Sequence, residues 1–219
     1  MKFFFAAALF LASGFLLAQT TKKVSFKNED PEFKEVYYVL EGQPEIKHGK
    51  YKKSSSGYAS LTEEGQYENN IKTGIWEYHS NAGLEQQIDF SNNTVLFSKP
   101  FKSLVGSLIV DGKNLKENNS GKVPILLGGQ AKLSRLFVKY MRYPADARRN
   151  GVQGSVIVSA TVTKEGLMID EMIEQGPGYG LNEEALRLIQ LIPDDWLPLI
   201  INDEALSTRV FIEVKFQLG

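Results

Sequence analysis

The sequence contains no cysteine among its 219 residues. Disulfide bonds, thiolate metal sites and a cysteine nucleophile are therefore excluded, and so is a lipid anchor attached to a cysteine behind a leader. The fold has to be stabilised by packing and hydrogen bonding alone.

Histidine is nearly as scarce, with His48 and His79 as the two examples. Neither lies at a metal-ligand or catalytic-triad spacing from suitable partners, so we expect both on solvent-facing turns. The glycine-rich stretches lack the Lys-Ser or Lys-Thr of a phosphate loop, and the adjacent carboxylates Glu183 and Glu184 would diverge on a helix. We therefore expect no enzyme, no cofactor and no metal.

An excess of charge of either sign is also absent: 25 Lys and Arg face 26 Asp and Glu, for a formal net charge of -1. Nucleic-acid binding depends on clustered basic residues, so it is not expected. Both signs are interspersed without a long single-sign block, which argues against a membrane-surface patch. Any membrane association is expected to run through partners.

Long apolar runs are confined to the beginning of the chain, where Lys2 precedes an apolar stretch from Phe3 to Ala18. This pattern is typical of a secretory leader, and we expect residues 1–19 to be a signal peptide cleaved near Ala18 or Gln19. An uncleaved N-terminal anchor is the alternative. Either interpretation predicts a location in the periplasm or cell envelope.

The next part of the chain, residues 20–115, is expected to be rich in β-strands. Between residues 33 and 97, aromatic residues recur beside glycines, strand-length runs such as Ile75–Tyr78 alternate with turn residues, and Asn69-Asn70 is one such turn. This predicts a small all-β array of hairpins. The stretch Gly65–Phe90 resembles the MORN-like repeats of bacterial envelope proteins.

An alternative function is attached to this region. Its aromatic side chains could form a surface strip, which would make the protein a structural or surface protein whose MORN-like hairpins bind glycan or lipid. In small hairpin arrays, however, aromatic residues are more often the core. The rings concerned are Tyr51, Tyr67, Trp76 and Tyr78.

The stretch between the two halves is polar. Leu104–Val110 is a plausible strand followed by a turn at Asp111-Gly112, and residues 116–125 read as a linker. We expect a domain boundary near this linker.

The last part of the chain has clear periodicity. Helical spacing of apolar residues over Ala131–Met141 predicts a helix, and strict alternation over Gly154–Thr163 predicts a half-buried strand. Leu167–Gln175 reads as the second strand of a hairpin, a second helix follows with Asn182 as its N-cap, and Val210–Leu218 alternates as a final strand. The predicted order is α-β-β-α-β.

These elements and the short motifs between them resemble the C-terminal domain of the TonB energy transducer over residues 126–219. The resemblance implies an α+β fold with a three-stranded antiparallel sheet and two helices on one face. It also implies a partner, an outer-membrane transporter whose short periplasmic segment pairs with an exposed strand. The motifs that carry it, in order, are Tyr143-Pro144, Ala147 with Gly151 and Gly154, Val156–Val162, Gly166, Glu183–Leu188 and Val210–Phe216.

The final strand is the expected binding site, because a free strand edge can hydrogen-bond to an added strand while alternate side chains select the partner. The predicted partner-binding residues are Arg209, Phe211, Glu213, Lys215 and Gln217. The alternative is that this strand only completes the sheet. The resemblance also implies that edge strands can swap between chains, so a homodimer is a further alternative. The sequence has no proline-rich spacer, so we expect an interaction module linked to TonB-dependent transport and not a transmitter of force.

Overall fold

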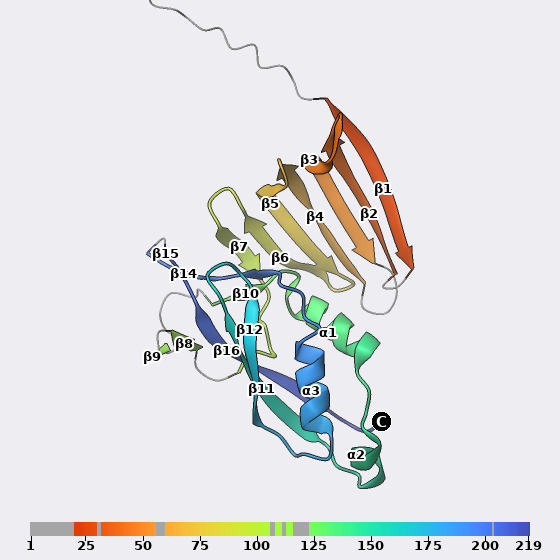
Figure 1. Cartoon of the computed structure of the whole chain (residues 1–219), viewed down its shortest axis with the longest axis vertical. Helices are drawn as coiled ribbons and strands as arrows, with labels where there is room; N and C mark the ends of the chain where they lie inside the picture. Colours follow the sequence, from red (N-terminus) through yellow and green to blue (C-terminus); the bar gives the residue numbers. More distant parts are fainter. Residues whose placement is uncertain are drawn as a thin grey trace, which may run out of the picture.

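The structure is a computed structural model that describes residues 20–29, 32–55, 60–105, 108–110, 113–115, 123–202 and 204–219. An all-β part lies at one end of the elongated molecule, and an α+β part lies at the other (Figure 1). The predicted leader, residues 1–19, lies outside the described residues. Within the described ranges, no helix has the length and apolar character needed to cross a membrane.

The all-β part is a single antiparallel sheet in which each strand pairs with the next along the chain. Asn69 and Asn70 have φ values of 50° and 68° in the turn between two of the strands, which is the conformation of tight hairpin turns. The strands are β1 (Thr21–Glu29), β2 (Glu32–Leu40), β3 (Gln43–Ser55), β4 (Leu61–Glu68), β5 (Ile71–Ser80), β6 (Gly83–Asp89) and β7 (Thr94–Ser98).

The predicted run of hairpins is therefore observed, but as one continuous sheet that starts earlier than residue 33. His48 and His79 lie within β3 and β5, so their expected position on turns is wrong. The MORN-like resemblance of Gly65–Phe90 remains a prediction.

One face of this sheet is buried against the C-terminal part of the chain. Tyr51, Trp76, Tyr78 and Ile88 form a core with Leu127 and Leu197, which come from the other part. The Trp76 ring packs directly over Gly65, where a Cβ atom would lie 2.4 Å from the ring. These aromatic rings thus join the two parts.

The C-terminal part contains a second sheet, with strand order β12-β11-β16-β8-β9. Two short two-stranded sheets, β10 with β13 and β14 with β15, lie beside it. The strands are β8 (Leu108–Val110), β9 (Lys113–Leu115), β10 (Ile125–Leu126), β11 (Gly154–Val162), β12 (Met168–Gln175), β13 (Trp196–Leu197), β14 (Leu199–Ile201), β15 (Glu204–Leu206) and β16 (Thr208–Phe216).

The three helices described, α1 (Gly129–Tyr140), the short α2 (Ala145–Arg149) and α3 (Leu181–Ile189), all supply apolar residues to the core of this sheet. Every second residue of the two central strands is fully buried on the helix side, as the alternation predicted. The residues concerned are Val156, Val158, Ala160 and Val162 of β11, with Val210, Ile212, Val214 and Phe216 of β16. The predicted order α-β-β-α-β is observed, with α2 and the short strands β13, β14 and β15 as additions.

Two details of the prediction are wrong. The sheet is extended beyond three strands by β8 and β9, which come from before the helices in sequence. Asn182 is not the N-cap of α3, because the helix already begins at Leu181 behind Gly180, whose φ of 83° suits a glycine. The Asn182 side chain instead accepts a hydrogen bond from the Gly178 N–H at 3.1 Å and closes the preceding turn.

The stretch predicted as a linker, residues 116–125, lies mostly outside the described residues, and Ile125 at its end begins β10. The predicted strand at Leu104–Val110 is present in two pieces, an isolated bridge at Leu104 and β8. Both pieces hydrogen-bond to β16, so the end of the expected N-terminal region contributes to the C-terminal sheet.

Candidate partner-binding edge

β16 is flanked on both sides, although it was predicted to present a free edge. On one side it pairs with β11 without a break, from Thr208 opposite Val162 to Phe216 opposite Gly154. On the other side it meets residues 103–105 and β8, a segment that we call the strap. The predicted edge is therefore partly occupied by the chain itself.

The strap is bound to β16 through backbone hydrogen bonds. The Val105 N–H donates to the Phe211 carbonyl at 2.9 Å, and the Glu213 N–H donates to the Ser103 carbonyl at 2.7 Å. Leu104 lies opposite Ile212 between these two bonds, and β8 pairs with the beginning of β16, Ile109 opposite Arg209. The strap thus runs antiparallel to β16 from Thr208 to Glu213.

The strap ends at Ser103, whose backbone N–H and side-chain hydroxyl form hydrogen bonds with a residue of α1. The Ser103 N–H donates to Gln130 Oε1 at 3.0 Å, and Gln130 Nε2 donates to Ser103 Oγ at 3.1 Å. Because the Ser103 N–H is directed to Gln130, it is not available to the Glu213 carbonyl. The pairing between strap and β16 therefore stops at Glu213.

Beyond that point the edge of β16 opens into a groove of about 680 Å³ between the strand and α1. In an antiparallel ladder the backbone groups of alternate residues face the same neighbour, so those of Lys215 face the groove side, like those of Phe211 and Glu213. Within the described ranges, no segment pairs with Lys215 on that side. The groove is lined by Lys102, Ser103, Gln130, Ser134, Phe137, Val138, Met141, Tyr143, Arg148, Glu213 and Lys215.

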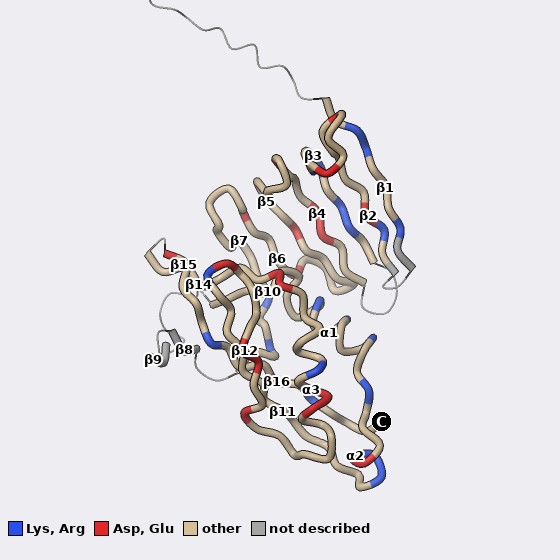
Figure 2. The backbone as a smooth tube through the Cα atoms, viewed as in Figure 1, with Lys and Arg blue, Asp and Glu red and all other residues tan. Residues whose placement is uncertain are grey.

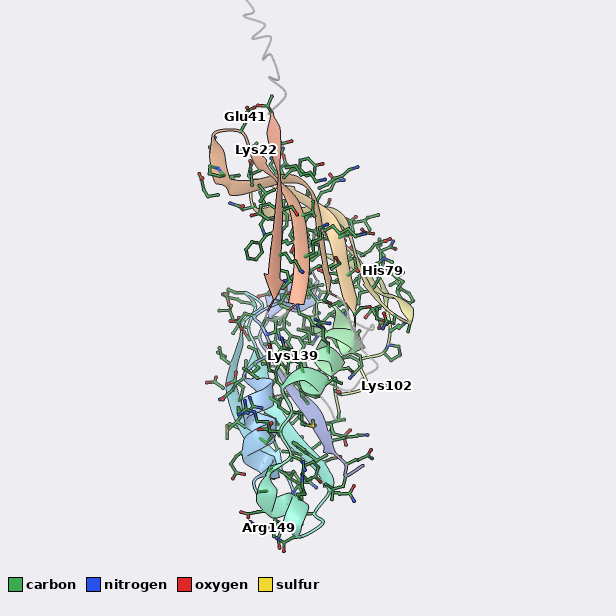
Figure 3. The ribbon with its side chains drawn as sticks, turned by 90° about the vertical axis from the view of Figure 1, so that its right-hand side faces the viewer. Lys22, Glu41, His79, Lys102, Lys139 and Arg149 are labelled. Atoms are coloured by element: carbon green, nitrogen blue, oxygen red, sulfur yellow. The ribbon has the colours of Figure 1, made fainter. Side chains whose placement is uncertain are left out.

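The walls of this groove combine apolar surface with charges of both signs. Val138 is the most exposed apolar residue of the helix wall, at 64%, and Phe137 and Met141 lie beside it on the same wall. Lys102, which Figure 3 labels next to α1, and Arg148 provide positive charge, and Glu213 provides negative charge. Such a groove suits an extended peptide with alternating apolar and polar side chains.

The five predicted partner-binding residues lie on one face of β16 and its continuation, the face away from the helices. Arg209 is engaged within the sheet, donating to Ser159 Oγ at 2.5 Å and to Glu174 Oε1 at 3.3 Å. Phe211 is half-buried, and its carbonyl accepts from the strap. The structure therefore places Arg209 and Phe211 beside the strap.

The other three predicted residues lie at the open end. Lys215 is exposed and its Nζ lies 3.2 Å from Glu213 Oε2. Hydrogen bonds from Ser155 and from Lys215 hold the pKa of Glu213 below its usual value, although partial desolvation opposes them. Gln217 is exposed and follows the strand. Glu213 and Lys215 are thus the predicted residues that line the open groove, and Gln217 follows the end of the strand. The contribution of α1 was not predicted.

The sheets have other edges. β1 carries lysines at positions 22, 23 and 27, coloured blue in Figure 2, which discourage pairing with another strand. β7 at the opposite edge exposes Val95, Leu96 and Phe97, and β12 exposes Ile169 and Met172. A groove of about 560 Å³ runs along β7, lined in part by Val95 and Leu197.

The outer face of the all-β sheet carries a group that could hold a divalent cation. Glu64 of β4 lies directly opposite Glu77 of β5, and His79 is on the same face, with ligand atoms within 4.8 Å of one another. These groups also have partners of their own: Lys52 contacts Glu64 at 2.8 Å, and His79 Nε2 lies 3.0 Å from Glu77 Oε2. A cation would have to compete with Lys52 for Glu64.

The aromatic residues considered as a glycan-binding strip do not form one. Trp76 and Tyr78 are fully buried, and Tyr51 is 6% exposed, because these rings pack into the core shared with the C-terminal part. Tyr67 packs edge-on against both Tyr51 and Trp76. Three of the four rings are therefore buried, and Tyr67 is half-buried beside them.

Residues 139–218 match the family described as Gram-negative bacterial TonB protein C-terminal. The chain carries a TonB C-terminal domain. The match extends from the end of α1 to just past β16, so it includes β11, β12, α3 and the whole candidate edge, whereas the all-β sheet and the strap lie outside it. No curated protein and no solved structure matches the chain.

The TonB C-terminal domain is a protein-interaction and energy-transduction domain and not an enzyme family. Proteins with this domain belong to the cell envelope and interact with partners such as outer-membrane transporters. Both properties agree with the chemistry of the edge, which offers backbone hydrogen-bonding groups and a groove.

Proposed function

We propose that the protein is a periplasmic interaction module that binds an extended peptide segment of an envelope protein by strand addition to β16. The observation that carries the proposal is the open end of β16 at Lys215, which lies next to a groove of about 680 Å³. β16 itself lies within the residues that match the TonB C-terminal domain, whereas much of the helix wall of the groove precedes them. A peptide placed there gains backbone hydrogen bonds from the strand and apolar contacts from α1.

The side chains around the groove suggest the character of the peptide. One side of an extended peptide would face Phe137, Val138 and Met141, so apolar residues at alternate positions are favoured. Lys102 and Arg148 at the groove favour a carboxylate on the peptide. A periplasmic segment of an outer-membrane transporter is the proposed source of such a peptide, and a homodimer formed through the same edge is a competing occupant.

The test is a selection of random peptides against the full chain, followed by affinity measurement with the selected peptide and with a copy N-methylated at alternate backbone positions. N-methylation removes the donors needed for strand addition and leaves the side chains in place, so binding is expected to fall by about tenfold or more.

A variant of the protein complements the modified peptide. Val138→Glu places a charge on the apolar wall of the groove and is expected to weaken binding, whereas Val95→Glu, at the remote strand β7, is the matched control. Equal binding of the methylated and unmethylated peptides, together with no effect of Val138→Glu, would contradict strand addition at β16.

A further inference from the structure

The edge of β16 is filled over most of its length by a segment that is not part of the matched family domain. The strap comes from residues 103–105 and 108–110, and the family match begins at residue 139. Within the TonB C-terminal domain itself, this side of β16 has no strand partner in the described residues. The strap therefore occupies a position that the domain alone leaves open.

The strap has the features of a strand-adding peptide. It is extended and antiparallel, it exchanges backbone hydrogen bonds with Phe211 and Glu213, and it places Leu104 opposite Ile212. Leu104 packs against the buried core of the domain, as does Phe101 just before the strap. A backbone ladder plus an apolar anchor at alternate positions is how peptides bind to sheet edges.

The strap is held less firmly than the strand on the other side. β11 pairs with β16 continuously from Thr208 to Phe216, but the strap pairs at Thr208–Arg209 and again at Phe211–Glu213. At its end it depends on the hydrogen bonds between Ser103 and Gln130. Replacing it with another extended segment exchanges one set of backbone hydrogen bonds for another of the same kind, so the hydrogen-bond contribution to the free energy of the exchange is small.

We propose that the strap is an internal occupant of the partner edge, and that the partner is an extended segment that displaces it and puts an apolar side chain where Leu104 now packs. The proposal rests on the proposed function and adds its regulation. The affinity measured for a peptide is then reduced by the fraction of molecules in which the strap is released. Stabilising the strap weakens binding, and loosening it strengthens binding.

Leu104 and Ile212 provide a direct test. The hydrogen bonds on either side of them are made by their neighbours, so they form a non-hydrogen-bonded pair, in which Cα atoms lie about 4.5 Å apart. This separation falls within the range of disulfide bonds. Because the chain has no cysteine, the variant Leu104→Cys, Ile212→Cys holds the sole thiols, and its reduced form is a control with identical side-chain losses.

The probe is a selected peptide of about ten residues, long enough to cover β16 at roughly 3.3 Å per residue. The oxidised variant is expected to bind it at least about tenfold more weakly than the reduced variant. Leu104→Asn, which loosens the strap, is expected to strengthen binding severalfold, with Val123→Asn, an exposed position outside the strap, as the matched control.

A second measurement needs no variant. In the unmodified chain, hydrogen exchange of the Val105 amide is expected to accelerate when the peptide is added, because its acceptor on Phe211 is taken by the peptide. Unchanged protection of Val105 in the saturated complex would overturn displacement, and so would equal binding by the oxidised and reduced variants.

Failure of strap displacement can be distinguished from failure of the proposed function. If the oxidised variant binds normally and N-methylation still abolishes binding, the peptide pairs only beyond Ser103: the proposed function stands and displacement is wrong. If no peptide binds any form of the chain, including Leu104→Asn, both proposals fall.

Discussion

The side chain of Gln86, in β6, bridges the backbone on both sides of Leu127. Its Nε2 donates to the Leu126 carbonyl at 3.0 Å, and its Oε1 accepts from the Gly128 N–H at 2.8 Å. Gln86 is 2% exposed, so both backbone groups would be buried without it. One polar side chain therefore connects the all-β sheet to the residues that lead into α1.

Gln86→Leu is expected to lower the free energy of unfolding by roughly 1–3 kcal/mol, because it leaves a buried donor and a buried acceptor without partners. Urea denaturation monitored by circular dichroism measures the loss. Gln87→Leu, on the outer face of the same strand, is the control and should change stability far less. Equal losses would show that the bridge does not couple the two parts.

Gly65→Ala is expected to destabilise the protein by about 1–3 kcal/mol, because the new methyl group would overlap the Trp76 ring. Tryptophan fluorescence during urea denaturation reports the change. The same substitution in a Trp76→Leu background removes the overlap, so its additional cost should nearly vanish. A full loss in that background would assign the effect to the backbone of β4 instead.

Glu184 ties the end of α1 to α3. It accepts hydrogen bonds from the Arg142 N–H and from Arg187, both at 2.7 Å, and Arg187 also donates to the Tyr140 carbonyl. Burial alone would raise the pKa of Glu184, but these hydrogen bonds outweigh it and the pKa is lowered.

Because the folded pKa lies below the unfolded value of about 4.3, this contribution to stability is present above that value and is lost as the pH falls through the folded pKa. Glu184→Gln is expected to cost about 1–3 kcal/mol at neutral pH and little once the pH is below the folded pKa of Glu184. Thermal denaturation from pH 2 to 7 checks this. The substitution Glu183→Gln, at the exposed neighbouring position, is the control and should leave the loss of stability at acidic pH unchanged.

Asp195 lies between two lysines, one from each part: its carboxylate is 2.5 Å from Lys132 Nζ and 3.8 Å from Lys72 Nζ. Burial lowers the pKa of Lys72, and Asp195 opposes that shift. Asp195→Asn should therefore lower the pKa of Lys72 further and destabilise the fold by about 1–2 kcal/mol, between the effects typical of exposed and buried pairs.

The size of this effect depends on pH. A lysine whose folded pKa lies below its unfolded value of about 10.4 lowers the free energy of unfolding at neutral pH. This loss disappears as the pH rises from the folded pKa to the unfolded pKa. The loss caused by Asp195→Asn should thus be largest near pH 7 and shrink towards pH 10. Asp146→Asn, on the exposed helix α2, is the control, and a pH-independent loss would exclude Lys72 as the cause.

The sequence predicted what is local in this fold. Strict alternation identified β11 and β16, and helical spacing identified α1, because each pattern is imposed by a buried face that repeats along the segment itself. The strap was predicted as a strand at Leu104–Val110, but nothing in its sequence states that its partner is β16. Pairing across the chain depends on register and competition between edges, which no short pattern encodes.

In the candidate site, too, the local features were predicted and the contacts between distant segments were not. The five alternate residues from Arg209 to Gln217 were identified from their strand, but their availability differs: Arg209 bonds to Ser159 and Glu174, and Lys215 borders an open groove. Nothing in the sequence around Val138 indicated a binding role. It is an exposed apolar residue of a helix, and it lines the groove only because β16 lies beside that helix.

The distance in sequence between β8 and β16 also determines when these two strands can pair during folding. Ile109 pairs with Arg209, about one hundred residues later, whereas every strand of the all-β sheet pairs with its immediate neighbour in sequence. Local hairpins form quickly, and long loops close late because their closure costs more chain entropy. We therefore expect the all-β sheet to form before β8 pairs with β16, so that the strap remains unpaired until the last step of folding.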